Sequence, residues 1–244
     1  MEKCKILGVN INVLNMKKTI DIIIKNRENI KGKYICVSNV HTTVMSSEDN
    51  KYKEIQNSAY MVLPDGGPLS FVSKLRGFKH AERVTGPDLM KEIFKISELY
   101  GYTHYFYGST ENTLEKLKIN LKRDYPNLNI VGMYSPPFRV LSNSEDVDII
   151  NNINMVNADF LWVGLGAPKQ EIWMYEHRNK IDSIMIGVGA GFDYFAGKIR
   201  RAPKWMQRLC LEWLYRLIQE PKRLFKRYFF TNIKFIKNAI ILRK

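Results

Sequence analysis

The sequence has few cysteines and no long apolar run. Cys4, Cys36 and Cys210 are far apart and form no C-x-x-C pair, so neither a disulfide framework nor a zinc site is expected, and a reducing cytosol fits. Nowhere do about 18 apolar residues run together, so the sequence predicts no membrane-spanning helix. The amino terminus also lacks the apolar core and cleavage site of a secretion signal, and we expect it to be retained.

Two common nucleotide-binding motifs are missing as well. Pro168 and Lys169 follow Gly166, which breaks the dinucleotide spacing G-x-G-x-x-G, and no G-K-[ST] of a P-loop occurs. These absences disfavour a nicotinamide or ATP enzyme, and no cofactor is expected. The four histidines also show no metal-ligand spacing.

The basic charge is concentrated at one end of the chain. Residues 200–244 hold thirteen Lys or Arg against two Glu, whereas the preceding 199 residues carry only +3 of the net +14. A basic charge confined to one end indicates an anionic surface or a polyanion as the partner.

Short β-branched or aromatic runs alternate with longer runs of helical period. Strands are predicted at residues 34–37, 61–63, 104–107, 129–133, 159–164 and 184–188, and helices at 87–100, 110–124, 145–156 and 169–180. This alternation predicts an α/β fold with a Rossmann-like, largely parallel sheet. Ligands of such a sheet bind at the carboxyl ends of its strands.

After Gly197 the pattern changes to two helical stretches, 204–219 and 221–242, and Pro221 is well placed to begin the second. We therefore expect an α/β core over residues 1–197 and a helical basic appendage over 198–244. An apolar stripe follows helical spacing in the second stretch: Phe225, Phe229, Ile233, Ile236 and Ile240. Flanked by Lys and Arg, the stripe is typical of a helix in a membrane interface; the alternative is a helix packed on its own domain.

Polar side chains follow several predicted strands. Asp65, within Leu63-Pro64-Asp65-Gly66-Gly67-Pro68, stands where a carboxylate can accept a proton from an attacking hydroxyl; the alternative is a helix N-cap or turn residue. Asn39 and the run 164–171 follow two other strands. They offer polar side chains and free N–H groups that suit phosphate, uracil or sugar hydroxyls.

One D-x-D, Asp146-Val147-Asp148, formally matches the motif that holds a sugar-nucleotide diphosphate through a divalent cation. It opens a predicted helix, where acidic residues favour the N-terminal dipole, and we therefore expect no metal. Cations of the protein would then have to neutralise a departing diphosphate. The candidates are Arg83, Arg216, Arg223, Lys226 and Arg227.

Several motifs together resemble the WecG/TagA/CpsF glycosyltransferase family. They are Asp65-Gly66, Arg83-Val84-Thr85-Gly86-Pro87-Asp88, Gly164-x-Gly166-x-Pro168-Lys169-Gln170-Glu171, Gly189-Ala190-Gly191-Phe192-Asp193, Arg201-Ala202-Pro203 and Glu212-Trp213-Leu214-Tyr215-Arg216 followed by Glu220-Pro221-x-Arg223. The resemblance spans nearly the whole chain, and the combination of P-K-Q-E with the terminal motifs is specific.

The resemblance implies an inverting, metal-independent transfer of a sugar, with N-acetylmannosamine as the best expectation, from its UDP form. The implied acceptor is polyprenyl-diphosphate N-acetylglucosamine, in linkage-unit synthesis for wall teichoic acid. The family's general base matches Asp65, and its pocket positions match Asn39, Arg83 and Gln170. The appendage arginines Arg216, Arg223 and Arg227 match an appendage that closes over the diphosphate at the membrane.

Two departures from the family put the identity of the sugar in question. Val37 stands where many relatives have Thr, and Gly66-Gly67-Pro68-Leu69 differs from the D-G-I-G form of the mannosaminyl enzymes. A hexose or uronic acid transferred in capsule or exopolysaccharide synthesis is therefore an alternative within the family.

A non-enzymatic module that binds an anionic membrane or nucleic acid is the alternative from another class. It explains the basic end but not the polar, glycine-rich loops after the strands, so we expect no nucleic-acid partner. The expected location is the cytoplasmic face of the membrane, as a peripheral protein. The sequence leaves the oligomeric state open, a homo-oligomer included.

Overall fold

The computed structural model describes residues 1–242, without the side chain of Arg208. Arg243 and Lys244, which belong to the predicted appendage, lie outside the described residues. The described chain forms two compact units. One unit contains residues 1–19, 37–85 and 199 onward, and the other contains residues 20–36 and 86–198.

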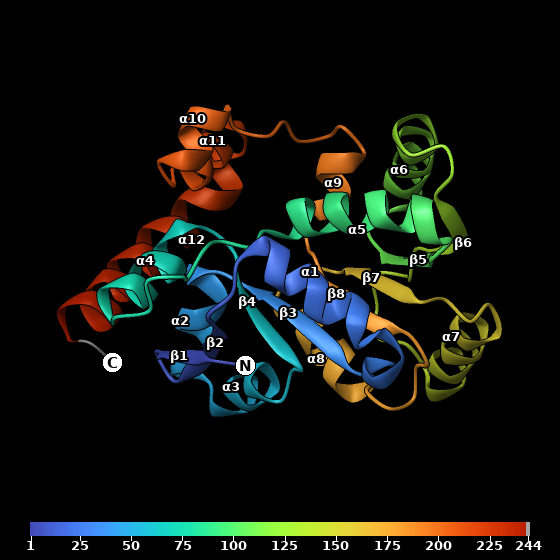
Figure 1. The fold of residues 1–244 in the computed structure, drawn as a ribbon, viewed down its shortest axis with the longest axis horizontal. Coiled ribbons are helices and arrows are strands. Elements are labelled where there is room, and N and C mark those ends of the chain that lie inside the picture. Colours follow the sequence, from blue (N-terminus) through green and yellow to red (C-terminus); the bar gives the residue numbers. More distant parts are fainter. Residues whose placement is uncertain (243–244) are drawn as a thin grey trace. The chain divides into compact units, whose positions relative to one another are not determined.

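A six-stranded sheet confirms the predicted α/β fold (Figure 1). Its strands are β3 (Tyr34–Ser38), β4 (Met61–Pro64), β5 (Thr103–Gly108), β6 (Asn129–Tyr134), β7 (Phe160–Gly164) and β8 (Ile184–Gly187). The order in the sheet is β4-β3-β8-β7-β5-β6, and the strands from β3 to β6 in this order pair in parallel. All six strands fall where the alternation of the sequence predicted them.

In the second unit, residues 20–36 and 86–198, helices follow the strands in α/β fashion. They are α5 (Gly86–Tyr100), α6 (Glu111–Asp124), α7 (Asn143–Met155), α8 (Lys169–Glu176) and α9 (Gly191–Phe195). The ring of Phe94 on α5 contacts five aromatic rings, among them Trp162 on β7 and Phe195 on α9. His104 is fully buried beside them and accepts a hydrogen bond from Trp162 Nε1 at 3.0 Å. Burial lowers the pKa of His104 to about 3, so this histidine is a neutral part of the core.

The first unit begins with a hairpin of two four-residue strands that the sequence analysis did not predict. β1 (Lys3–Ile6) pairs antiparallel with β2 (Val9–Asn12). The buried Asn12 then accepts a hydrogen bond from the backbone of Val62 in β4 at 2.7 Å. The hairpin is thereby tied to the strand that leads to Asp65.

Several helices complete the first unit. They are α2 (Val40–Glu48), α3 (Asn50–Asn57), α4 (Gly67–Leu75), α10 (Lys204–Arg208), α11 (Glu212–Gln219) and α12 (Pro221–Phe235), followed by a π-helical turn at Ile236–Ile241. Helix α1 (Met16–Lys25) and a 3-10 turn (Arg27–Ile30) complete the described helices. Pro221 begins α12 as predicted.

The appendage differs from the prediction in one respect. The stretch expected as one helix over 204–219 is broken into α10 and α11, because Cys210 between them has a left-handed backbone with φ of +60°. Beyond the break, α12 runs beside α2 in Figure 1, and these two helices pack together. The appendage groups with residues 1–19 and 37–85 in one compact unit.

Candidate active site

Asp65 stands at the end of β4, as predicted. Its backbone N–H donates to the carbonyl of Ser38 at the end of β3, at 2.7 Å, so the carboxyl ends of these two strands lie side by side. Gly66 follows with φ of +92°, a conformation that favours glycine, and α4 begins at the next residue. The half-buried carboxylate of Asp65 is therefore held in the turn between strand and helix.

Asn39 lies beside Asp65 because it follows β3. Its side-chain oxygen caps α2 by accepting hydrogen bonds from the backbone of His41 at 3.0 Å and of Thr42 at 3.2 Å. With the oxygen engaged, the amide NH₂ is the donor in the hydrogen bond to the Asp65 carboxylate. This hydrogen bond stabilises the ionised form of Asp65 and orients its carboxylate.

The surroundings of Asp65 raise its pKa to about 6. Burial is the largest cause, and the negative charge of Glu212 acts in the same direction. The cations Arg216 and Arg201 and the hydrogen bond from Asn39 oppose the increase. A carboxylate with such a pKa is ionised at neutral pH and is a stronger base than an ordinary Asp, which suits proton abstraction.

Arg83 contacts two residues of the appendage. Its guanidinium donates to Glu212 Oε2 at 3.3 Å and to the side-chain oxygen of Gln207 at 3.0 Å. Arg201 donates to the other Glu212 oxygen at 2.7 Å. Two arginines therefore enclose Glu212, and Arg83 joins the segment after α4 to the corner between α10 and α11.

Three residues of this arrangement received no role from the sequence: Arg201, Gln207 and Glu212. Arg201 and Glu212 do stand within the motifs R-A-P and E-W-L-Y-R, which is the signal that could have identified them. Gln207 carries no such signal. Its side chain also donates to the carbonyl of Ala202 at 2.7 Å, so its role emerges only from the folded corner.

The three predicted appendage arginines have different environments. The positive charge of Arg216 acts to lower the pKa of Asp65, and its Nε lies 3.6 Å from Glu220 Oε2. Arg223 also pairs with Glu220 but is 58% exposed. The structure therefore places Arg216, and not Arg223, in the electrostatic environment of the predicted base.

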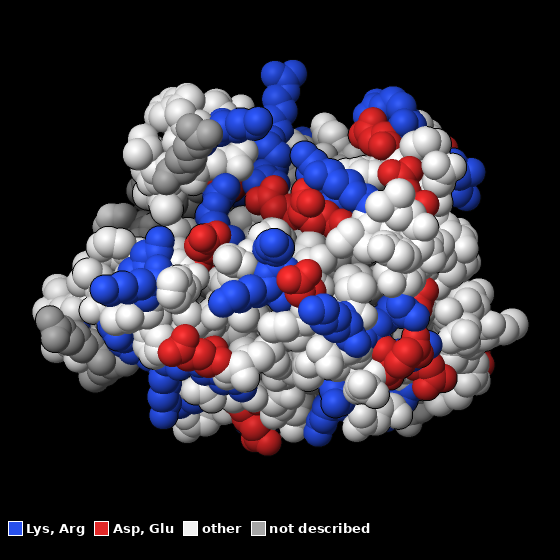
Figure 2. Space-filling model, in the orientation of Figure 1, with Lys and Arg blue, Asp and Glu red and all other residues white. Residues whose placement is uncertain are grey.

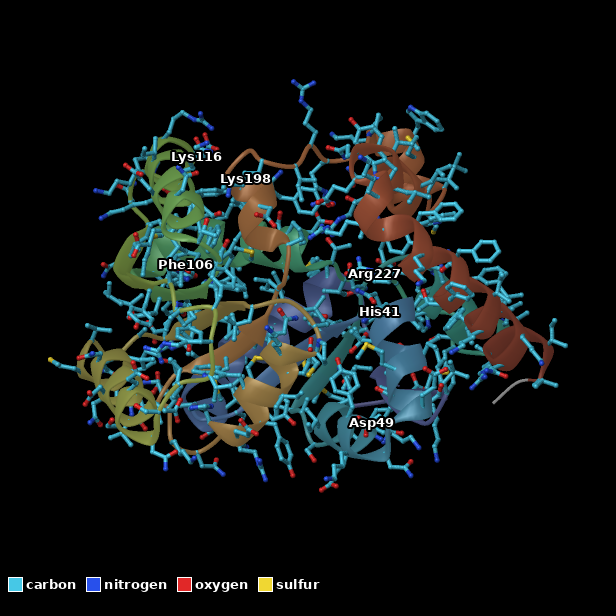
Figure 3. The ribbon with its side chains drawn as sticks, turned by 180° about the vertical axis from the view of Figure 1, so that it is seen from behind. His41, Asp49, Phe106, Lys116, Lys198 and Arg227 are labelled. Carbon is cyan, nitrogen blue, oxygen red and sulfur yellow. The ribbon has the colours of Figure 1, made fainter. Side chains whose placement is uncertain are left out.

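Arg227 lies beside His41, as Figure 3 shows, with Arg227 on α12 and His41 on α2. Burial and the charge of Arg227 lower the pKa of His41 to about 4, so its imidazole is neutral at pH 7. Within the described chain, His41 Nδ1 and Arg227 Nε have no hydrogen-bond partner. Both atoms are buried, and their hydrogen-bonding capacity is not used by the described residues.

Gln170 shapes two loops of the second unit. Its side-chain oxygen accepts from the backbone N–H of Gly166 at 3.2 Å and of Gly189 at 3.0 Å, and its nitrogen donates to Glu171 at 2.8 Å. The side chain is only 4% exposed. Gln170 thus fixes the backbone after β7 and β8, which the sequence reasoning, concerned with a ligand contact, did not anticipate.

The D-x-D motif has a structural partner. Ser142 and Glu145 form the capping box of α7, as expected of a helix start. Asp146 does more than favour the helix dipole, because both of its oxygens lie 3.0 Å from Nε2 of the buried His177. Among residues 1–242, no group of three or more His, Cys, Asp or Glu side chains is arranged to hold a metal ion.

Comparison with known proteins identifies the chain's relatives. An enzyme of Bacillus subtilis (strain 168) is 30% identical over 211 residues, which is 86% of this chain and 80% of the relative. One of Staphylococcus aureus (strain MW2) is 29% identical over 226 residues, 91% of this chain and 87% of the relative. Both are named N-acetylglucosaminyldiphosphoundecaprenol N-acetyl-beta-D-mannosaminyltransferase.

The model of the "Glycosyl transferase WecG/TagA/CpsF family" matches residues 4–244, almost the full length of the chain. This match includes both the strand-end loops that carry Asn39 and Asp65 and the helices that carry Glu212 and Arg216. The chain therefore belongs to the WecG/TagA/CpsF family and is a glycosyltransferase.

Proposed function

We propose that this glycosyltransferase moves N-acetylmannosamine from its UDP form onto polyprenyl-diphosphate-linked N-acetylglucosamine, in wall teichoic acid-type polymer synthesis. The names of the relatives support the acceptor and the sugar. The observation that carries the chemistry is the Asp65 carboxylate, oriented by Asn39 and made more basic by its surroundings.

In the proposed mechanism, a carboxylate oxygen of Asp65 takes the proton of the acceptor hydroxyl. The oxygen of that hydroxyl forms a bond to C1 of the donor sugar while the bond from C1 to the UDP oxygen breaks. A single displacement inverts the configuration at C1. The cation Arg216, with Arg227 and Arg223 further along the appendage, stabilises the negative charge on UDP as it leaves.

No divalent metal has a role in this mechanism. Asp146, the first residue of the only D-x-D, is engaged by His177, and arginines are available to neutralise the diphosphate. The purified chain is therefore expected to retain transfer in excess EDTA. Transfer that disappears with EDTA and returns with Mg²⁺ or Mn²⁺ would contradict this mechanism.

A panel of UDP-sugars tests the proposed substrates, with a lipid-linked N-acetylglucosamine acceptor and product analysis by mass and anomeric configuration. UDP-N-acetylmannosamine is expected to give the highest kcat/KM and a product of inverted configuration. A higher kcat/KM with a UDP-hexose or UDP-uronic acid would favour capsule or exopolysaccharide synthesis, the alternative that Val37 and Gly67 keep open.

A membrane surface is the proposed location of the reaction, on the cytoplasmic face. Helix α12 buries Leu224 and Phe235. Of the five predicted stripe residues, Ile240 is half-buried, and the others are each at least 50% exposed: Phe225, Phe229, Ile233 and Ile236. The alternative of a helix that buries this stripe against its own domain does not explain that exposure. Within the described chain, no helix combines the length and hydropathy needed to cross a bilayer.

Charge around the stripe favours an anionic lipid surface. Lys222, Lys226 and Lys237 are exposed along the same helix and its π-helical end. On the face drawn in Figure 2, basic side chains alternate with acidic ones and form no single continuous basic patch. Apolar insertion and local basic charge therefore act together in the proposed contact.

Replacing Phe225 and Phe229 together by Ser is expected to weaken binding to vesicles of anionic lipid by about 10-fold or more, because burial of one Phe side chain contributes about 1.5–3 kcal/mol. Sedimentation with vesicles measures the effect. Leu99→Ser with Ile119→Ser is the matched control, since these side chains are 81% and 61% exposed on the second unit. Equal vesicle binding by the two double variants would contradict the assignment of the stripe.

A further inference from the structure

The side chain of Cys210 occupies the space that a side chain at Gly67 would need. A Cβ added to Gly67 would lie 1.8 Å from Sγ and 2.3 Å from Cβ of Cys210, and real Cβ atoms do not approach other atoms below about 3.0 Å. Both residues belong to the same compact unit. The glycine that distinguishes this chain from the D-G-I-G form is thus matched to a cysteine in the appendage.

The backbone holds Cys210 in this position. Its φ of +60° is uncommon for a residue with a side chain, and its N–H donates to the carbonyl of Gln207 at 3.2 Å. Arg83 and Arg201 fix Gln207 and Glu212 on either side of it. Four side chains around the corner therefore determine where the thiol lies.

Gly67 is coupled to Asp65 through a very short segment. It is the first residue of α4, and only Gly66, with its φ of +92°, separates it from Asp65. The backbone of Asp65 is fixed on its other side by the hydrogen bond to Ser38. A displacement of Gly67 is therefore transmitted to the Asp65 carboxylate.

We propose that Cys210 is a positioning residue for Asp65: its side chain, seated on Gly67, sets the turn that aims the carboxylate. This inference rests on the proposed role of Asp65 as the base. It predicts that residues 67 and 210 are coupled by size, so that one of the two positions must carry no side chain.

A double-mutant cycle tests the coupling. Gly67→Ala forces the turn away from Cys210, and kcat is expected to fall by about 10²-fold, the effect typical of a reacting group misplaced by about 1 Å. Cys210→Gly removes both clashing atoms and suits the left-handed backbone. The double variant is therefore expected to recover at least about 10-fold of the lost turnover. A double variant as slow as Gly67→Ala would overturn the proposal.

The pH profile separates positioning from a loss of folded protein. If Asp65 moves, its burial changes and its pKa changes with it. The acid limb of the pH profile, which is the rise of kcat with pH as Asp65 ionises, is therefore expected to shift in Gly67→Ala and to return in the double variant. Lys74→Ala, in the last turn of α4, is the control, because the side chain of Lys74 is exposed. An unmoved acid limb in a folded Gly67→Ala enzyme would also overturn the proposal.

Chemical modification provides a second test if Gly67→Ala does not fold. Cys4 and Cys36 are buried, whereas Cys210 is partly exposed, so a small methylthiolating reagent is expected to react first at Cys210. The added group enlarges the side chain on Gly67 and is expected to lower kcat by about 10²-fold. A fully modified enzyme with native kcat and acid limb would overturn the positioning role.

The outcomes are distinguishable from a failure of the proposed function. If Asp65→Asn turns over normally, the base assignment and the positioning role both fail. If Asp65→Asn is slow but the 67–210 double variant does not recover, only the positioning role fails.

Discussion

Asp65→Asn is expected to lower kcat by about 10²–10⁴-fold, the usual contribution of a general base, with little change in UDP affinity. The amide is nearly the same size as the carboxylate and keeps the turn at Gly66, but it cannot take a proton. Single-turnover transfer and UDP titration measure the two quantities. Asp124→Asn, at an exposed carboxylate paired with Arg123, is the control that should retain turnover. Native turnover by a folded Asp65→Asn enzyme would remove the base assignment.

The same variant has a pH signature. Because the pKa of Asp65 is about 6, kcat of the native enzyme is expected to rise with pH through that value and to level off above it. This acid limb should be absent from the residual activity of Asp65→Asn.

Stability is expected to change in the opposite direction from activity. Folding raises the pKa of Asp65 from 3.8 to about 6, so ionisation destabilises the folded state. The penalty is absent below about pH 4, grows as pH rises to about 6 and is complete above it. At about 1.4 kcal/mol per pKa unit, its upper value is about 3 kcal/mol. Asp65→Asn should therefore unfold at higher denaturant concentration than the native chain at pH 7, with no such difference at pH 4.

Arg216→Ala is expected to lower kcat by about 10²–10³-fold, the effect of removing one group that stabilises developing charge. Arg216→Lys keeps the charge but loses the planar fork that suits a diphosphate, so turnover should still fall while vesicle binding survives. Arg223→Lys is the matched comparison. Because Arg223 is more exposed and only Arg216 of the two acts on the pKa of Asp65, the effect of Arg223→Lys on kcat should be the smaller one.

The acid limb of the pH profile distinguishes a role of Arg216 at the active site from a role in membrane anchoring alone. The charge of Arg216 lowers the pKa of Asp65, so Arg216→Ala should move the limb to higher pH. If Arg216→Lys and Arg223→Lys both turn over normally on a membrane-embedded acceptor, the appendage is only an anchor. The stabilising cation would then be sought in the core, with Arg83 the first candidate.

The order of the elements was readable from the sequence because hydrophobic periodicity is a local signal. The six sheet strands, the helices α5 to α8 and the start of α12 at Pro221 all lie where the pattern placed them. The hairpin β1–β2, helices α1 to α4 and the short helix α9 were not predicted. The break at Cys210 was also missed, because a left-handed cysteine has no signature in the sequence.

The sequence by itself determined that Asn39 and Asp65 would lie at the same edge of the sheet, because both follow strands of a largely parallel sheet. That β3 and β4 are neighbours, which brings the two residues together, was decided by the fold. Only the tertiary structure decided which charges surround them. Arg83, a candidate diphosphate ligand by motif, is engaged by Glu212, which is 129 residues further along the chain and also raises the pKa of Asp65. Electrostatic effects and steric fit depend on distances through space, as at Gly67 and Cys210, and those distances exist only once the chain has folded.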